Sequence, residues 1–279
     1  MSTRLCGIGD EAARALPDQL DILDSCGMTA IELRTVDGRL LHELHREHLE
    51  DLVRTVRERG FEVPVIDTPI GGWSTSVMTD ERAELALLAQ YAEIARRFGA
   101  RLRIMSYPND GLSEHEWATQ AIRRVRRLVI EADALGVTLL HENCAGFGGA
   151  GPDQACRLLE GVGDGLDVIF DVGNGLAYGY DAVAYLDAVL PAVRHVHVKD
   201  GVRRTDGAVF LPPGHGSARL AECLEILRRR GFDGWYSLEP HVSHIPHLHQ
   251  TGSPTELTQG FVSCAGNFRH ILEDSHVAA

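Results

Sequence analysis

Residues 137–171 read VTLLHENCAGFGGAGPDQACRLLEGVGDGLDVIFD and contain one complete strand–helix–strand unit. The apolar run at 137–142 predicts a strand, 152–160 predicts a helix, and 167–171 predicts a second strand. The two strands end on carboxylates, Glu142 and Asp171. A helix between two such strands is typical of the crossover connection that joins parallel strands.

The same alternation extends over the whole chain. We expect strands at 4–8, 29–34, 63–67, 101–105, 137–142, 167–171, 194–199 and 234–239. Apolar residues at i, i+3 and i+4 predict helices at 17–26, 43–59, 80–98, 113–135, 152–160, 181–190, 218–230 and 255–273. Eight such units predict an α/β fold, a (β/α)8 TIM barrel that comprises residues 1–279 as a single domain. A doubly wound sheet is the competing fold, but GIGDEA at 7–12 is a poor dinucleotide fingerprint.

The predicted helix ends carry suitable residues. Asp80, Ser113 and Asp181 stand where a side chain would cap a helix N-terminus. Glycine stands just past five of the helices, at Gly27, Gly60, Gly99, Gly136 and Gly231. These signals therefore agree with the strand–helix alternation.

Composition limits the classes of function. The net charge is −13, which argues against nucleic acid or an anionic membrane as the main partner. The basic run RRVRR at 123–127 is expected on a solvated helix face. No apolar stretch reaches the length of a transmembrane helix, and the N-terminus lacks the apolar region of a secretory signal. The six scattered cysteines predict free thiols in a cytoplasmic protein.

The last four predicted strands each bring a potential metal ligand to the same rim. These ligands are Glu142, Asp171, His197 and Glu239. The carboxyl ends of parallel barrel strands meet at one face, with neighbouring strands about 4.8 Å apart. Each acidic residue alone is also typical of a turn or an N-cap. The set of three carboxylates and one imidazole predicts one divalent ion, Mn2+ first, with Mg2+ or Co2+ as alternatives.

Several segments resemble one family. They are AIELR at 30–34, HENCAG at 141–146, FDVGN at 170–174, HVHVKD at 195–200, GHG at 214–216 and SLEPH at 237–241. Over nearly its whole length the chain resembles the xylose-isomerase-like TIM-barrel superfamily of sugar isomerases and epimerases. That resemblance implies that Glu142, Asp171, His197 and Glu239 bind one divalent ion. It also implies that Glu142 and Glu239 form the acid/base pair.

Such a site favours proton abstraction next to a carbonyl. A bound cation stabilises the resulting enediolate, and two carboxylates on opposite faces move the proton. We therefore expect an isomerase or epimerase of carbohydrate metabolism that acts on a sugar or polyol ketone. The alternative is a lyase or dehydratase that eliminates a β-substituent from a keto-sugar, inosose or dehydroshikimate-like substrate. An endonuclease IV-like activity fits the acidic composition poorly, and a catalytically silent subunit stays open.

Four further residues are expected to bind the substrate: Asn174, Lys199, Arg203 and His241. Asn174 stands where the similar ketose 3-epimerases carry a histidine, and Arg203 matches the spacing of their substrate arginine. Lys199 is the only lysine of the chain. It is expected either to form a salt bridge with Asp200 or a neighbouring carboxylate, or to bind a substrate oxygen beside the metal.

Three other features are open to more than one interpretation. The segment 241–249 holds four histidines, of which His244, His247 and His249 are expected in a lid or an interface rather than in a second metal site. His195 is expected in the core or beside the metal ligands. Trp73 either stacks on a sugar ring or packs under its loop. The expected partner is a small-molecule sugar or polyol substrate. A homo-oligomer is one of the assemblies that the sequence leaves open.

Overall fold

The computed structural model describes residues 3–205, 207–245 and 250–277. His247 and His249 lie outside the described residues. The eight predicted strands are present as β1 Arg4–Ile8, β2 Ala30–Glu32, β5 Val65–Asp67, β6 Arg101–Ser106, β7 Leu139–Gly146, β8 Leu166–Asp171, β9 Val193–Val198 and β12 Trp235–Leu238. They form one parallel sheet in the order β2-β1-β12-β9-β8-β7-β6-β5. Isolated bridges from Ala30 to Glu62 and from Leu33 to Ile66 nearly close the barrel. The predicted TIM barrel is confirmed.

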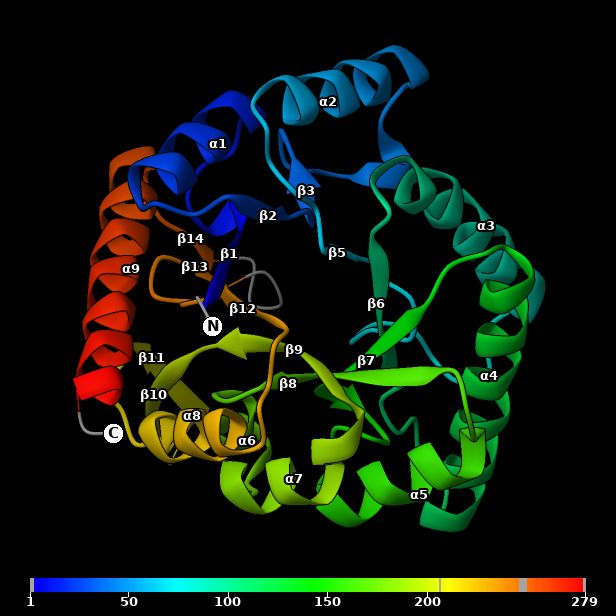
Figure 1. Cartoon of the computed structure of the whole chain (residues 1–279). Helices are drawn as coiled ribbons and strands as arrows, with labels where there is room; N and C mark the ends of the chain where they lie inside the picture. Colours follow the sequence, from blue (N-terminus) through cyan, green and yellow to red (C-terminus); the bar gives the residue numbers. More distant parts are fainter. Residues whose placement is uncertain (1–2, 206, 246–249, 278–279) are drawn as a thin grey trace.

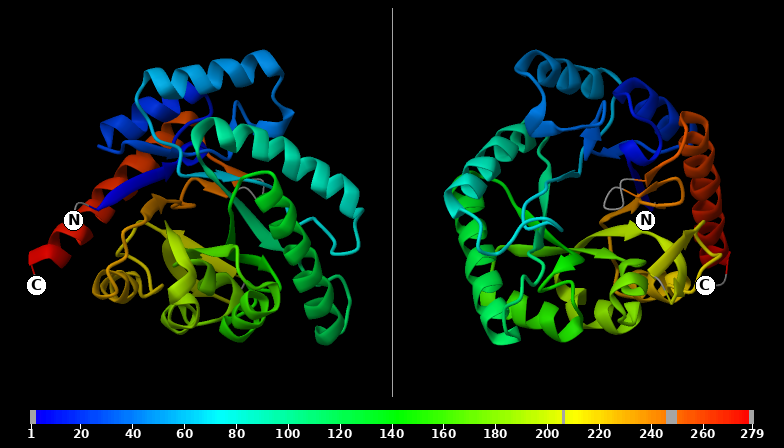
Figure 2. Two further views of the ribbon diagram at one scale, coloured as in Figure 1. Left: turned by 45° about the vertical axis from the view of Figure 1, so that its right-hand side comes forward. Right: turned by 180° about the vertical axis from the view of Figure 1, so that it is seen from behind.

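The helices form a ring outside the strands, and the chain runs round this ring once (Figure 1). The long helices are α1 Leu16–Ser25, α2 Arg46–Glu58, α3 Glu81–Phe98, α4 Glu114–Ala134, α5 Pro152–Val162, α7 Ala182–Val189, α8 Leu220–Arg229 and α9 Pro254–Val277. Each corresponds to a predicted helix. The last helix, α9, lies beside α1 in both face-on views, so the ring closes where the two ends of the chain meet (Figure 2).

Strand alternation decides which side chains enter the barrel. In β9, Val196 and Val198 belong to the main apolar cluster, in which strands pack against the surrounding helices. His195 and His197 occupy the alternate positions and are buried on the other side of the strand. Successive side chains of a strand point to opposite faces, so both histidines face the barrel interior. The buried side chains of Val65, Leu140 and Ile169 form a separate apolar cluster.

Several smaller elements have no counterpart in the sequence-based prediction. They are the hairpins β3 Thr35–Val36 with β4 Arg39–Leu40, β10 Asp200–Arg204 with β11 Gly207–Leu211, and β13 His244–Ile245 with β14 Gln250–Thr251, the short helix α6 Asn174–Tyr178, and the 3-10 turns η1 Gly9–Glu11, η2 Leu41–Glu43 and η3 Leu190–Ala192. The β10–β11 hairpin and α6 follow directly on two strands that carry site residues. None of the described helices has the length and apolar character needed to cross a membrane.

The basic run at 123–127 is only partly a solvated face. Arg124 is buried, and its Nη2 lies 2.6 Å from Oε2 of Glu84, which also accepts a hydrogen bond from the hydroxyl of Tyr107. Arg123 and Arg127 form ion pairs at the surface, as expected. The prediction of a wholly solvated face is therefore wrong for Arg124, because the buried carboxylate of Glu84 is its partner.

The three predicted N-caps are confirmed, since Asp80, Ser113 and Asp181 each accept a hydrogen bond from a backbone N–H of the following helix. Ser113 forms a full capping box with Glu116. The five predicted glycines adopt left-handed φ angles between 66° and 72°. This conformation ends a helix at little cost only for glycine, and at Gly99 it forms the C-cap of α3.

We expect Ser113→Ala to lower the free energy of unfolding by about 1 kcal/mol, the usual cost of losing an N-cap. The reason is that the N–H of Glu116 would lose its acceptor at 3.3 Å. Urea denaturation followed by circular dichroism measures the change. Thr119→Ala, on the same helix, is the control, because Thr119 only donates to the carbonyl of His115. An equal effect of the two substitutions would contradict the capping interpretation.

Candidate metal centre

Four strands bring Glu142, Asp171, His197 and Glu239 together at the carboxyl end of the barrel. One ligand atom of each lies within 4.8 Å of all the others, and all four side chains are buried. Nδ1 of His197 lies 3.3 Å from Glu239, 3.7 Å from Glu142 and 3.9 Å from Asp171. Asp171 and His197 are direct neighbours in the β8–β9 register. The convergence expected from the strand ends is therefore present in the fold.

The sequence predicted that the strand ends at Glu142, but in the structure it does not end there. The strand β7 continues to Gly146 through a register shift against β6. Asn143 follows Glu142 and exchanges hydrogen bonds with the backbone of Asp171: its Nδ2 donates to the carbonyl and its Oδ1 accepts from the N–H. Through Asn143, this extension holds the backbone next to Glu142 in a fixed position relative to the backbone of Asp171.

In three of the four residues, the protein holds one polar atom and leaves another facing the cluster, whereas both oxygens of Glu142 have partners, Oε1 in Asn174 and Oε2 in Arg103. Oδ1 of Asp171 accepts from the backbone N–H groups of Gly173 and Asn174, at 2.7 and 2.9 Å. Oε1 of Glu239 accepts from Arg34 at 2.8 Å. Nε2 of His197 lies 2.9 Å from Oε1 of Glu32. This arrangement fixes the direction of the remaining atoms.

Those remaining atoms fit a cation. Asp171 Oδ2, His197 Nδ1 and Glu239 Oε2 are buried, and among the described residues they have ion-pair contacts but no hydrogen bond of good geometry. A cation at the centre of the cluster would satisfy all three atoms at once. Three oxygen donors and one nitrogen donor suit a hard or borderline divalent ion, so the residues present fit the metal that the sequence predicted.

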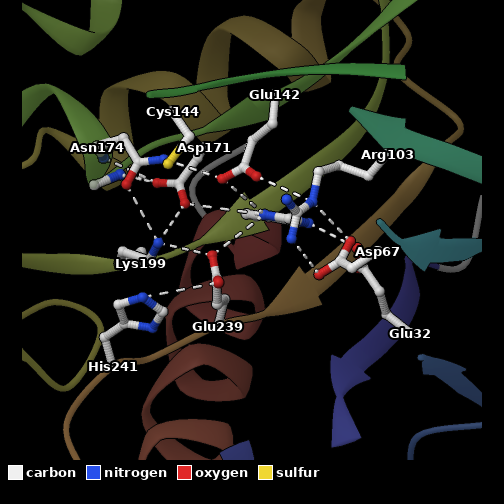
Figure 3. A network of polar contacts seen from close by, with 12 residues as sticks. Glu32, Asp67, Arg103, Glu142, Cys144, Asp171, Asn174, Lys199, Glu239 and His241 are labelled. Atoms are coloured by element: carbon white, nitrogen blue, oxygen red, sulfur yellow. Dashed lines mark hydrogen bonds and ion pairs between the residues drawn. The ribbon is translucent and has the colours of Figure 1, made fainter. Parts of the chain in front are cut away.

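Lys199 follows β9 directly and stands beside the cluster (Figure 3). Its Nζ lies 2.7 Å from Asp171 Oδ2 and 2.7 Å from Glu239 Oε2, and it donates to Asn174 Oδ1 at 3.3 Å. The salt bridge with neighbouring carboxylates that the sequence allowed is present. Asp200 is not its partner, because the Asp200 carboxylate accepts from the backbone N–H groups of 201, 214, 216 and 218.

Cationic neighbours set the charge of the carboxylates. Burial raises the pKa of Glu142, but Arg103 and His197 outweigh it and lower that pKa to about 2. The pKa of Glu239 is likewise well below its usual range: burial raises it, whereas Lys199 and nearby histidines lower it more. For Asp171 burial prevails over Lys199, and its pKa rises to about 6. Glu142 and Glu239 are therefore anionic at neutral pH.

Sequence reasoning missed Glu32, which holds both histidines of β9. Its Oε2 lies 2.8 Å from His195 Nε2, and its Oε1 lies 2.9 Å from His197 Nε2. Glu32 is fully buried in β2 and reaches these groups across the barrel interior. A carboxylate within the apolar run AIELR was the available signal. His195 is thus buried in the core beside His197 of the cluster, which agrees with its expected position.

Two buried arginines were missed as well. Arg34 donates to Asp10, Glu11 and Glu239, and Arg103 pairs with Asp67 and, at 3.3 Å, with Glu142. Each guanidinium therefore links a carboxylate of the cluster to a further buried acid, as Figure 3 shows for Arg103 with Glu142 and Asp67. Arg34 thus binds three carboxylates and Arg103 binds two, which restricts the orientation of the Glu239 and Glu142 side chains.

Of the four predicted substrate residues, the structure brings three to the cluster. Asn174 donates to Glu142 Oε1 at 3.1 Å, and Nε2 of His241 lies 3.9 Å from Glu239. Lys199 is the third. Arg203 is exposed on β10, with its guanidinium next to Gly179, so the structure does not bring it to the cluster. Its role stays a prediction.

A cavity of about 30 Å³ opens directly on the cluster. Its wall includes Glu142, Lys199, Glu239 and Phe210 of the unpredicted β10–β11 hairpin. Trp73 also lines it, so this indole lies at the site rather than wholly under its own loop. His244, by contrast, lies away from the four ligands and contacts Thr251 at 2.9 Å.

Comparison with known proteins places this geometry in context. A family profile described as a xylose isomerase-like TIM barrel matches residues 20–259. The rhizopine catabolism protein MocC of Rhizobium meliloti is 26% identical over 199 residues, which are 59% of this chain and 61% of that protein. An inosose dehydratase of Geobacillus thermodenitrificans (strain NG80-2) is 24% identical over 143 residues, 46% of this chain and 48% of that protein. The matches thus span less than two thirds of either relative.

Solved structures share the fold at low sequence identity. A D-tagatose 3-epimerase-like protein superposes with a TM-score of 0.76 at 16% identity, covering 99% of this chain and 100% of that one. A xylose isomerase-like TIM barrel protein from Mycobacterium smegmatis, solved in complex with magnesium, gives a TM-score of 0.70 at 18% identity over 98% of both chains.

Proposed function

Because the chain belongs to the xylose isomerase-like TIM barrel family, we propose that it is a divalent-metal-dependent isomerase or epimerase of a sugar or polyol ketone. The observation that carries the proposal is the buried four-residue cluster, in which one ligand atom of each residue lies within 4.8 Å of all the others. The similarity to a D-tagatose 3-epimerase-like structure supports the fold on which this chemistry rests.

We assign the metal to Glu142, Asp171, His197 and Glu239, with Mn2+ as the expected ion and Mg2+ or Co2+ as alternatives. When bound, such an ion acts as a Lewis acid that polarises a carbonyl and stabilises negative charge on adjacent oxygens. The chain supplies the remaining charge, because Arg34, Arg103 and Lys199 surround the three carboxylates. The magnesium complex of a structural relative agrees with a divalent ion in this fold.

The proton would be moved by Glu142 and Glu239. Both carboxylates are anionic at neutral pH and line the small cavity, so either can accept a proton from a carbon next to a substrate carbonyl. Return of a proton from the opposite face gives epimerisation, and return to the neighbouring carbon gives isomerisation. Lys199, Asn174 and His241 would bind substrate oxygens, while Phe210 and Trp73 exclude water.

The second candidate is a lyase or dehydratase, which the similarity to an inosose dehydratase favours. Abstraction of the same proton, followed by departure of a β-hydroxyl or another β-substituent, gives an unsaturated ketone. The same residues would serve, so the two candidates differ only in the fate of the carbanion. The cytoplasmic location, which the six free cysteines favour, and the homo-oligomer stay predictions.

We expect the purified protein to contain a divalent metal and to incorporate deuterium from D2O into a ketose at a carbon next to the carbonyl. Mass spectrometry of a ketose and inosose panel measures the exchange, and metal analysis identifies the ion. Treatment with EDTA should abolish exchange, and added Mn2+ should restore it. A new ultraviolet absorbance would identify the lyase instead. Exchange that is indifferent to EDTA, or absent from every compound of the panel, would contradict the proposal.

A further inference from the structure

A second, much larger cavity adjoins the cluster. Its volume is about 740 Å³, and it lies over the strand ends and loops of the first half of the barrel and the segment that begins α9. Trp73 and Arg103 line both this cavity and the small one at the metal cluster. The two cavities are therefore neighbours that share these two side chains in their walls.

The walls of the large cavity are mainly apolar. Leu40, Pro69, Trp73, Met105 and Leu257 line it, together with polar residues that include Asp10, Arg14, Asp67, Thr68 and His244. The arginines that approach it from the metal side are already neutralised, Arg34 by three carboxylates and Arg103 by two. Hydroxyl groups placed against the apolar part of these walls would lose hydrogen bonds to water without replacement. The surface beside Trp73 and Leu257 thus favours an apolar group as its occupant.

Backbone contacts fix the position of Trp73. Gly71 has a φ of +68°, and a Cβ at this position would lie 2.4 Å from the carbonyl oxygen of Met105, so only glycine fits. The N–H of Tyr107 donates to the carbonyl of Gly71 at 2.8 Å, and that of Met105 donates to Ile70 at 3.0 Å. The loop is thereby attached to the end of β6, and 40% of the Trp73 side chain is exposed.

We infer that the substrate carries an apolar, ring-sized substituent, which lies in the large cavity against Trp73 while its sugar or polyol part lies at the metal cluster. The placement of the sugar or polyol part at the metal cluster rests on the proposed function. Cavities of about 300–1,000 Å³ enclose drug-sized ligands, and a monosaccharide is much smaller than these. A sugar joined to an aromatic ring matches both the size of the cavity and its apolar lining, and Trp73 is the specificity-determining residue.

The test compares matched glycosides without turnover. Isothermal titration of the Mn2+-loaded full chain measures the Kd of the phenyl and methyl β-glycosides of D-glucose, D-galactose and D-xylose. Burial of the phenyl ring should tighten binding about tenfold or more over the methyl partner in at least one pair. Trp73→Ala should remove this preference and Trp73→Phe should retain most of it. Met78→Ala, in the same loop but exposed and outside the cavity wall, should leave it unchanged.

Two outcomes would overturn the inference. One is the absence of a phenyl preference in all three pairs. The other is a preference that survives both Trp73→Ala and Leu257→Asp, because the ring would then bind elsewhere. Deuterium exchange into ketoses is measured on the same preparation and separates the two proposals. Exchange without a phenyl preference refutes only the apolar substituent, and a Trp73-dependent preference without exchange refutes only the proposed reaction.

Discussion

Glu239→Gln is expected to lower kcat/KM for deuterium exchange by about 10²–10⁴-fold, the usual contribution of a positioned acid or base. Glutamine keeps the size of the side chain and still accepts the hydrogen bond that Arg34 donates at 2.8 Å. It cannot accept the substrate proton, and it is a weaker ligand than a carboxylate. Exchange rates measured at saturating Mn2+ separate the loss of the base from the loss of metal affinity.

Asp10→Asn is the matched control for this prediction. Asp10 also binds Arg34, at 2.7 Å, but it is not one of the four cluster residues. If Glu239 acts directly, Asp10→Asn should cost far less activity than Glu239→Gln. Equal losses would mean that the arginine network, rather than the carboxylate of Glu239, limits the reaction, and our assignment of Glu239 as acid or base would be wrong.

The barrel was predictable because its signals are local. Each strand is an apolar run and each helix has its own periodicity, so no long-range contact is needed to recognise them. The β10–β11 hairpin was missed for the opposite reason. Arg203 and Arg204 are exposed, and the hairpin depends on Asp200, whose carboxylate binds backbone N–H groups as far away as Ala218. Such a contact leaves no periodic pattern in the sequence.

The same distinction applies to the site. The convergence of Asp171 and His197 followed from parallel strands alone, because strand neighbours must lie side by side at the rim. Glu32 was missed because β2 and β9 are separated by β1 and β12 in the sheet. Their contact arises only when the sheet curves into a barrel. Arg203 shows the limit of spacing arguments, since it lies in the separate β10–β11 hairpin that begins at Asp200 and is exposed there.

The role of Glu32 gives the second large expected effect: Glu32→Gln should weaken the binding of Mn2+ by about 10–100-fold, as is usual when the partner of a ligating histidine is lost. Glu32 is ionised, since burial raises its pKa but His197 and His195 lower it well below the usual range. The carboxylate therefore holds the proton on Nε2 of His197 and directs Nδ1 towards the cluster. A glutamine amide fixes that tautomer less strongly.

Titration of the metal-free protein with Mn2+, followed by electron paramagnetic resonance of the free ion, measures this affinity independently of any substrate. His195→Asn is the control, because His195 uses the other oxygen of Glu32 and leaves the contact between Oε1 and His197 in place. If Glu32 acts through His197, His195→Asn should weaken Mn2+ binding much less than Glu32→Gln. Unchanged affinity in Glu32→Gln would show that the orientation of His197 is set by packing alone. If Glu32→Gln weakens Mn2+ binding and Glu32→Asp keeps it close to that of the unchanged protein, the effect is due to the negative charge that faces Nε2 of His197.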